Sequence, residues 1–148
     1  GTGHVLGITG ASAQHMAGVD ISRDMLSLAR QRLGAKAMGK DLDLRRADMN
    51  QLPFENNQFD LASMHLVLRH AANPERALRE AARILKPGGI LVVLDLAAGA
   101  IDGTDDQRSG FQKDEVPGFF QSAVLHHDHT MELTQGSLKG FCWQARKA

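Results

Sequence analysis

The sequence predicts an α/β fold with a mostly parallel sheet, on the strength of three observations. Strand-like segments alternate with helix-like segments along the chain, which is the order of βαβ units. The segment 90–96 (ILVVLDL) is almost entirely apolar, as expected of a strand covered on both faces. Acidic residues follow the apolar part of two other predicted strands, at Asp20 and Asp48. In a parallel sheet these carboxyl ends meet at one edge, where ligands bind.

The first half of the chain contains three predicted strands and one helix. Residues 17–20 are the end of a short strand, and Ser22 then caps a helix that ends at Gly34. Segments 41–47 and 59–66 are the next strands, the second of them buried. The helix presents apolar residues at helical spacing, namely Met25, Leu26, Ala29 and Leu33.

The second half opens with the clearest helix signal. Asn73 is a capping residue and Pro74 fits the first helical position. The sequence KPGG at 86–89 stops this helix, and 90–96 is the next strand. One face of the helix carries the apolar stripe Leu78, Ala81, Ala82 and Leu85.

The remaining residues predict a loop, a helix and a hairpin. We expect a loop at 97–115, and a helix at 117–124 with Phe119 and Phe120 facing inward. Two final strands, around 131–133 and over 138–145, flank Gly136-Ser137 and predict an antiparallel hairpin.

Composition indicates one ordinary globular domain over residues 1–148. Lys plus Arg and Asp plus Glu both number 17, and this balance argues against direct nucleic-acid binding. Cys142 is the single cysteine, so no disulfide forms within the chain and a cytoplasmic location is expected. The longest apolar run is too short to span a membrane.

The chain opens on a glycine loop, Gly1-Thr2-Gly3. Such loops normally follow a buried strand, so we expect that the first strand of the sheet lies upstream and is missing from this sequence. The loop departs from the dinucleotide pattern G-x-G-x-x-G, because Leu6 stands at the third glycine position and Gly7 is one residue late. This departure disfavours a nicotinamide-dependent oxidoreductase.

The two acids at strand ends suit an adenosine. Asp20 lies about 20 residues after the loop, where a carboxylate can accept both hydroxyls of a ribose. Asp48 ends the next strand and can accept from an adenine amino group, with Met49 covering the ring. The alternatives are that Asp20 caps a helix and that Asp48 is a loop acid beside a core methionine.

In five segments the chain resembles the class I S-adenosylmethionine-dependent methyltransferases. The segments are GTG, GVDIS..ML..AR, RRADMNQLPF, FDLASMHLVLRH and EAARILKPGGILVVLDL, in the expected order over residues 1–96. The resemblance is closest to the ubiquinone/menaquinone-biosynthesis type. Within it, the chain is similar to methyltransferase domains fused to arsenic-repressor-type regulators.

The resemblance implies a Rossmann-like fold, S-adenosylmethionine as cofactor and methyl transfer to a small-molecule substrate. It implies that Gly1, Thr2 and Gly3 approach the methionine part of the cofactor. Asp20 would hold the ribose, with Ile21 beside the adenine, which Asp48 and Met49 would bind. His65 and Leu66 would flank the methionine and the substrate entrance.

A general base is optional in methyl transfer, and His65 and His70 are the best-placed candidates because histidine titrates near neutral pH. Each could equally be a structural or solvent-facing histidine. Arg69 is expected to be a surface charge, although it could bind an acidic substrate.

One alternative function is a non-catalytic domain that senses a metabolite for a transcriptional regulator. The sequence His126-His127-Asp128-His129 also suggests a metal site, because His127 and His129 would share one face of a strand. No further ligand is spaced to close such a site, so we predict none.

Overall fold

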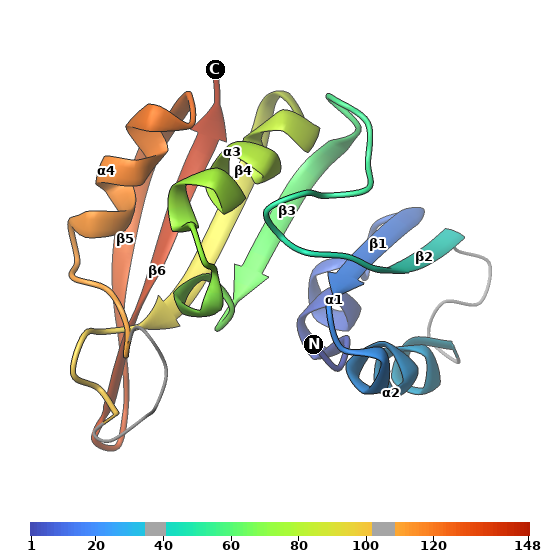
Figure 1. The fold of residues 1–148 in the computed structure, drawn as a ribbon, viewed down its shortest axis with the longest axis horizontal. Helices are drawn as coiled ribbons and strands as arrows, with labels where there is room; N and C mark the ends of the chain where they lie inside the picture. Colours follow the sequence, from blue (N-terminus) through green and yellow to red (C-terminus); the bar gives the residue numbers. More distant parts are fainter. Residues whose placement is uncertain (35–40, 102–108) are drawn as a thin grey trace. The chain divides into compact units, whose positions relative to one another are not determined.

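The computed structural model describes residues 1–34, 41–101 and 109–148 (Figure 1). Contacts along the chain divide it into two compact units, the N-terminal unit Gly1–Pro53 and the C-terminal unit Phe54–Ala148. Each unit is described by itself below. The expectation of one domain over 1–148 stays a prediction, and most of the loop expected at 97–115 lies outside the described residues.

The N-terminal unit contains two parallel strands joined through a helix. β1 (His15–Asp20) and β2 (Asp41–Arg46) pair in parallel, from His15 opposite Asp41 to Asp20 opposite Arg46. α2 (Arg23–Gly34) lies between them in sequence and begins where predicted, with the Ser22 hydroxyl accepting from the Met25 amide at 3.3 Å. The strand–helix–strand order predicted for this region is therefore confirmed.

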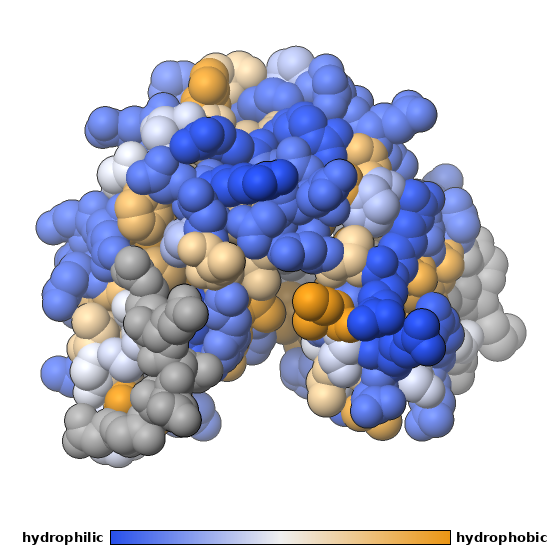
Figure 2. Space-filling view, in the orientation of Figure 1, coloured by the Kyte–Doolittle hydropathy of each residue, from blue (hydrophilic) through white to orange (hydrophobic). Residues whose placement is uncertain are grey.

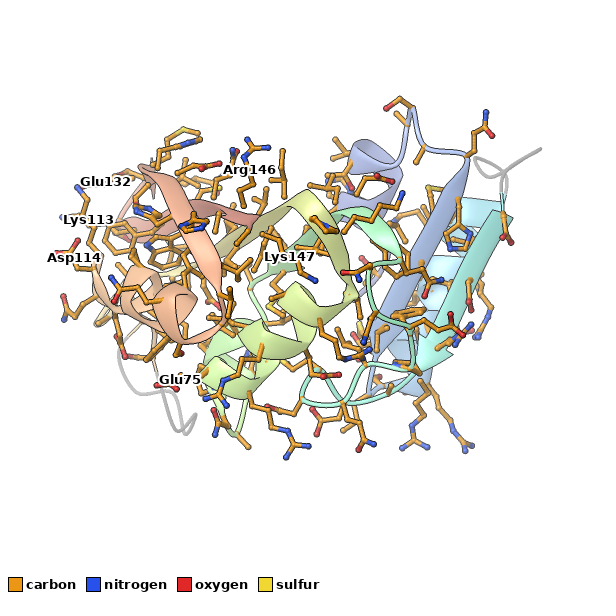
Figure 3. The ribbon with its side chains drawn as sticks, turned by 90° about the horizontal axis from the view of Figure 1, so that it is seen from above. Glu75, Lys113, Asp114, Glu132, Arg146 and Lys147 are labelled. Carbon is orange, nitrogen blue, oxygen red and sulfur yellow. The ribbon has the colours of Figure 1, made fainter. Side chains whose placement is uncertain are left out.

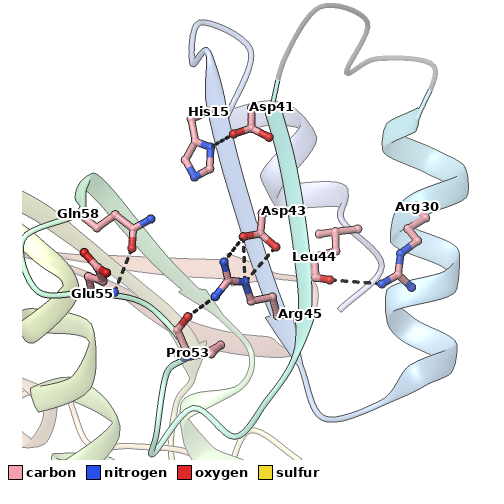
Figure 4. Close-up of polar contacts among 9 residues, drawn as sticks. All are labelled: His15, Arg30, Asp41, Asp43, Leu44, Arg45, Pro53, Glu55 and Gln58. Atoms are coloured by element: carbon pink, nitrogen blue, oxygen red, sulfur yellow. Dashed lines mark hydrogen bonds and ion pairs between the residues drawn. The ribbon is translucent and has the colours of Figure 1, made fainter.

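Polar side chains brace the two strands of this unit (Figure 4). His15 Nδ1 lies 2.8 Å from the Asp41 carboxylate, and Arg30 on α2 donates to the Leu44 carbonyl at 3.2 Å. Arg45 pairs with Asp43 on the same strand and also donates to the Pro53 carbonyl. The pKa of Asp43 is lowered, chiefly by the hydrogen bond from Arg45.

A short helix, α1 (His4–Thr9), follows the glycine loop and was not predicted. Its packing depends on glycine. A Cβ on Gly3 would lie 2.9 Å from Leu33 Cδ1, and one on Gly7 would lie 3.1 Å from Leu33 Cδ2. The glycines of this segment thus serve close packing against α2, as well as any approach of a ligand.

The C-terminal unit is a four-stranded sheet in the order β3-β4-β6-β5. β3 pairs with β4 in parallel, whereas β6 pairs with β4 and with β5 in antiparallel fashion. Each unit thus contains one parallel pair, β1–β2 and β3–β4, and the predicted α/β fold with an antiparallel C-terminal hairpin is confirmed. The strands are β3 (Phe59–His65), β4 (Leu85–Leu96), β5 (Leu125–Gln135) and β6 (Leu138–Lys147).

Two helices cover one face of this sheet (Figure 1). α3 (Pro74–Ile84) begins as predicted, because the Asn73 side chain accepts from the Arg76 amide at 2.9 Å. Its inner face includes fully buried Leu78, while the outward face is covered by hydrophilic side chains (Figure 2). α4 (Glu115–Ser122) contacts α3, and Ser122 Oγ lies 3.4 Å from a Glu75 carboxylate oxygen.

Several predicted boundaries were wrong. β4 begins at Leu85 rather than at 90, since Leu85 pairs with Phe59 and Ile90 with Leu61, and the KPGG segment bulges between these pairs with Gly88 at φ 77°. α4 begins two residues before the predicted helix and ends before Val124, whose φ is 58°. Phe120 is buried as predicted, but Phe119 is only half-buried.

β3 is less buried than predicted. Met64 is its one buried residue, and Leu61 is 44% exposed. Among the described residues β3 is an edge strand of its sheet, with β4 on one side only. An apolar sequence in this segment therefore did not guarantee that both faces were covered.

The core of the C-terminal unit centres on Trp143 of β6. Its ring meets Phe111 edge-on, with centroids 6.2 Å apart, and its Nε1 donates to the Lys113 carbonyl at 2.8 Å. The Lys113 ammonium also pairs with Glu132 of β5 at 2.7 Å (Figure 3). At the far end of β6, Lys147 Nζ donates to the Leu85 carbonyl at 2.8 Å. These contacts connect β5 and β6 to the segment before α4, which contains Lys113, and to Leu85 at the start of β4.

Candidate functional site

The predicted site residues fall into two groups, one in each unit. Gly1 to Gly3, Asp20, Ile21, Asp48 and Met49 belong to the N-terminal unit, whereas His65, Leu66 and His70 belong to the C-terminal unit. Each group lies at the carboxyl ends of parallel strands, the edge at which the sequence predicted a ligand.

Asp20 is the most constrained residue of the N-terminal group. It ends β1, its side chain is 17% exposed, and Oδ1 accepts from the Ser22 amide at 2.7 Å. Oδ2 lies beside the backbone nitrogen of Gly1, the first residue of the glycine loop. Ser22, rather than Asp20, supplies the side chain that caps α2.

The same contacts set the charge state of Asp20. Burial raises the pKa of this carboxyl, whereas hydrogen bonds from the Ser22 and Ile21 amides lower it. An aspartate is ordinarily an anion at neutral pH. Each carboxylate oxygen can accept more than one hydrogen bond, so both keep capacity for a further donor.

The glycine loop is held from the opposite side by α2. Arg32 Nη1 donates to the Thr2 hydroxyl at 2.6 Å and to the Thr2 carbonyl at 3.3 Å. Gly3 has φ 76°, a conformation that favours glycine, and it packs against Ala29 and Leu33. Sequence reasoning identified the loop but not Arg32 as its support.

Asp48 comes two residues after the end of β2, whose last residue, Arg46, lies opposite Asp20, so β2 ends earlier than predicted. The Ala47 amide donates to the Asp20 carbonyl at 3.2 Å, which places the residues after β2 alongside the end of β1. Asp48 Oδ1 accepts from the Asn50 amide at 2.8 Å and from the Asn50 side chain at 2.9 Å. Met49 is half-buried, whereas Ile21 is 66% exposed and is available to a ligand.

The C-terminal group lies at the end of β3, where His65 is the last residue of the strand, and on the turn that follows it. Leu66 has φ 54°, and its amide donates to the Leu94 carbonyl at 2.7 Å. A short 3-10 helix, η1 (Leu68–His70), comes next. His65 and His70 are both exposed, which suits a role at a surface but does not assign one.

The expectation that Arg69 is a surface charge was wrong. Its guanidinium is 15% exposed and lies 2.9 Å from the fully buried carboxylate of Asp95. Asp95 was not singled out from the sequence, although an acid near the end of an apolar strand was a signal that could have identified it. Its place next to the turn after β3 depends on the pairing of β3 with β4.

The histidine-rich segment lies on β5. The pairing shifts there, with His127 opposite Ala145 and His129 opposite Gln144, so the two histidines do not keep the regular alternation that would give them one face. Within residues 1–34, 41–101 and 109–148, no three His, Cys, Asp or Glu side chains are grouped so as to hold a metal ion. In the same ranges, no helix is long and apolar enough to cross a membrane.

Comparisons with known proteins bear on this site. A family model described as a methyltransferase domain matches residues 1–93. The ubiquinone/menaquinone biosynthesis C-methyltransferase of Ruegeria sp. is 32% identical over 127 residues, covering 86% of this chain and 50% of the relative. A demethylmenaquinone methyltransferase of Desulfitobacterium hafniense is 34% identical over 128 residues, covering 86% of this chain and 45% of the relative. This chain thus spans about half the length of these relatives.

The fold is also found among solved structures. A SAM-dependent methyltransferase from Methanosarcina mazei superimposes with a TM-score of 0.79 at 19% identity, covering 99% of this chain and 88% of that one. At this identity the likeness shows the fold alone. Together with the matched model, it confirms the Rossmann-like fold and the class of protein predicted from the five segments. The chain belongs to the methyltransferase domain family.

Proposed function

We propose that this chain binds S-adenosylmethionine through its N-terminal unit and takes part in methyl transfer to a small-molecule acceptor. The single observation that carries the proposal is the position of the Asp20 carboxylate. It ends β1, lies beside the first residue of the glycine loop, and accepts from the Ser22 amide just before α2. The names of the two relatives indicate a quinone precursor as the first acceptor to test.

The residues present fit an adenosine. Asp20 has acceptor capacity for a vicinal diol, and Asp48, one strand over, offers a carboxylate to an amino group. Gly3 packs its backbone directly against α2, and a Cβ on Gly1 would meet nothing within 4 Å, so the first residue of the loop has open space beside it. We therefore assign the ribose to Asp20 and the adenine to Ile21, Asp48 and Met49. The methionine part is assigned to Gly1, Thr2 and Gly3, together with His65 and Leu66.

When bound, the cofactor supplies an electrophilic methyl group on its sulfonium. What this chain must add is orientation of the acceptor and exclusion of water. His65 ends β3 and His70 lies on the turn after it, and either could take a proton from an acceptor whose nucleophile carries one. Leu66 lies between them in sequence and would present an apolar contact. We keep the cytoplasm as the expected location and propose no direct nucleic-acid partner.

Calorimetry distinguishes this proposal from a nicotinamide-binding one. Asp20 and Asp48 suit the adenosine that both ligands contain, whereas Leu6 departs from the pyrophosphate-binding pattern that NAD requires. We therefore expect S-adenosylhomocysteine to bind measurably and NAD not to bind. Tighter binding of NAD than of S-adenosylhomocysteine would overturn the assignment.

Activity is tested separately, with radiolabelled S-adenosylmethionine and demethylmenaquinol. Transfer of label to the acceptor supports an enzyme of the relatives' kind. Binding of S-adenosylhomocysteine without turnover on a panel of small phenols and hydroquinones would contradict the enzymatic part and favour a metabolite-sensing domain.

A further inference from the structure

The most unusual polar group outside the proposed adenosine site is the side chain of Asp95. It is fully buried near the end of β4, yet its carboxylate accepts three hydrogen bonds. The donors are Arg69 Nη1 at 2.9 Å, the Arg69 amide at 3.1 Å and the Leu96 amide at 2.8 Å. Two of the three bonds therefore come from one residue of the neighbouring turn.

Arg69 makes a further bond within its own turn. Its Nη1 also donates to the Leu66 carbonyl at 3.1 Å. A single nitrogen thus connects the buried carboxylate of β4 to the first residue after β3. Because the Leu66 amide already donates to the Leu94 carbonyl of β4, both backbone polar groups of Leu66 are fixed.

This double fixation explains a conformation that the sequence does not favour. Leu66 has φ 54°, and an unconstrained leucine rarely occupies that region. Such conformations persist where the surrounding structure over-determines them, and they occur often at functional sites. His65, which directly precedes Leu66, and His70, at the end of the same turn, are the residues proposed to face the acceptor.

A stabilising role alone accounts poorly for the pair. Burying a carboxylate and a guanidinium carries a desolvation penalty that can match or exceed their attraction, so a buried ion pair is weak support for stability. What such a pair provides is a fixed geometry, since a guanidinium offers its donors in one rigid plane. The ion pair between Arg79 and Glu75 differs from the Arg69–Asp95 pair, because it is exposed, lies within α3 at 3.1 Å, and holds no turn in place.

We propose that Asp95 and Arg69 are positioning residues, whose buried ion pair holds the turn Leu66–His70 in the one conformation that presents His65, Leu66 and His70 to the acceptor. The proposal rests on the proposed function for its catalytic consequence. Its structural part, the fixing of the turn, is measured without any acceptor.

The first experiment is amide hydrogen exchange on the full chain, comparing the parent with Asp95→Asn and Arg69→Lys. We expect protection of the Leu66, Arg69 and His70 amides to fall by about 10-fold or more in Asp95→Asn, with protection inside α3 unchanged. Arg69→Lys keeps the charge but loses the planar donor, and we expect a smaller fall. Arg79→Lys is the matched control and should change neither region.

The second experiment separates positioning from structure through kinetics, at a temperature well below the melting point of each variant. We expect kcat with the working acceptor to fall by about 10- to 100-fold in Asp95→Asn. The acceptor KM and the Kd of S-adenosylhomocysteine should change by less than about 10-fold, since the adenosine contacts are assigned to the N-terminal unit.

The outcomes are distinguishable. Failure of every acceptor while S-adenosylhomocysteine binds contradicts the enzymatic proposal, and the exchange experiment still decides whether the pair fixes the turn. Unchanged protection at residues 66–70 in both variants overturns the positioning role. If Asp95→Asn does not fold, Arg69→Lys alone decides, and unaltered exchange together with unaltered kcat in that variant counts against the proposal.

Discussion

The two units of this chain differ in how they are stabilised. The C-terminal unit contains four strands, two covering helices and an aromatic core around Trp143. The N-terminal unit contains two strands of six residues, and its buried apolar side chains are Met16, Leu26, Ala29 and Leu33. Small sheets of this kind are marginal by themselves, because they remove little apolar surface from water.

The comparison indicates a division of labour. The residues assigned to the adenosine are all in the unit with the smaller core, where polar contacts such as those of Asp20 and Arg32 hold the backbone. A ligand that binds the folded N-terminal unit should therefore stabilise it more visibly than it stabilises the C-terminal unit.

The largest expected effect comes from removing the aromatic core of the C-terminal unit. Trp143 is fully buried, so Trp143→Ala should lower the free energy of unfolding by about 3–5 kcal/mol. Urea unfolding followed by circular dichroism measures it. Trp143→Phe is the control, since it keeps an aromatic ring but loses the bond to the Lys113 carbonyl, and it should cost less. A cost below about 1 kcal/mol for Trp143→Ala would contradict the assigned core.

Asp20→Asn should separate ligand binding from folding in the N-terminal unit. The substitution keeps the size but removes charge-assisted hydrogen bonds worth about 1.5–3 kcal/mol each. The affinity for S-adenosylhomocysteine should fall by roughly 10- to 150-fold in calorimetry. Asp43→Asn is the matched control, a carboxylate of the same unit that pairs with Arg45, and it should leave the affinity within about 2-fold (Figure 4). Equal affinity of Asp20→Asn and the parent would leave Asp20 as a purely structural acid.

Gly3 and Gly88 have nearly the same φ, and comparing them tests how closely α1 packs against α2. Gly3 has φ 76° and Gly88 has φ 77°, but a Cβ on Gly3 would meet Leu33 at 2.9 Å, whereas one on Gly88 would meet nothing within 4 Å. Gly88→Ala should cost only the backbone strain, about 1 kcal/mol, and Gly3→Ala should cost about 1–3 kcal/mol more. Unfolding curves, with hydrogen exchange to identify the affected unit, measure both. Equal costs would mean that α1 does not pack on α2 as described.

The smallest effect concerns Cys142, at the centre of β6. Burial raises the pKa of its thiol, so less thiolate is present near pH 8 than in a free thiol. Alkylation by iodoacetamide should be at least about 10-fold slower in the folded chain than in urea. Because the thiol pKa is higher in the folded chain than in the unfolded chain, Cys142 contributes to the free energy of unfolding at pH values below the pKa of the unfolded thiol. This contribution is lost as the pH rises through the pKa of the folded thiol. Alkylation at the same rate in both states would show that β6 opens readily.

Local signals determined much of this fold from the sequence alone. The starts of α3 and α2 were predicted from Asn73-Pro74 and from Ser22, and the hairpin turn was predicted from Gly136-Ser137. These signals are local because helix capping and turn formation depend on only three or four neighbouring residues. The positions of Asp20 and Asp48 at strand ends also followed from sequence, since the order of strands and helices implies a parallel sheet with one ligand-binding edge.

What only the tertiary structure decided depends on pairing between distant segments. Arg69 looked like a surface charge because its partner, Asp95, is 26 residues away and meets it only when β3 and β4 align. The same is true of Arg32 on Thr2, which lies 30 residues away. Strand register and helix packing place such partners together, and neither is encoded in the few neighbouring residues from which a local pattern is read.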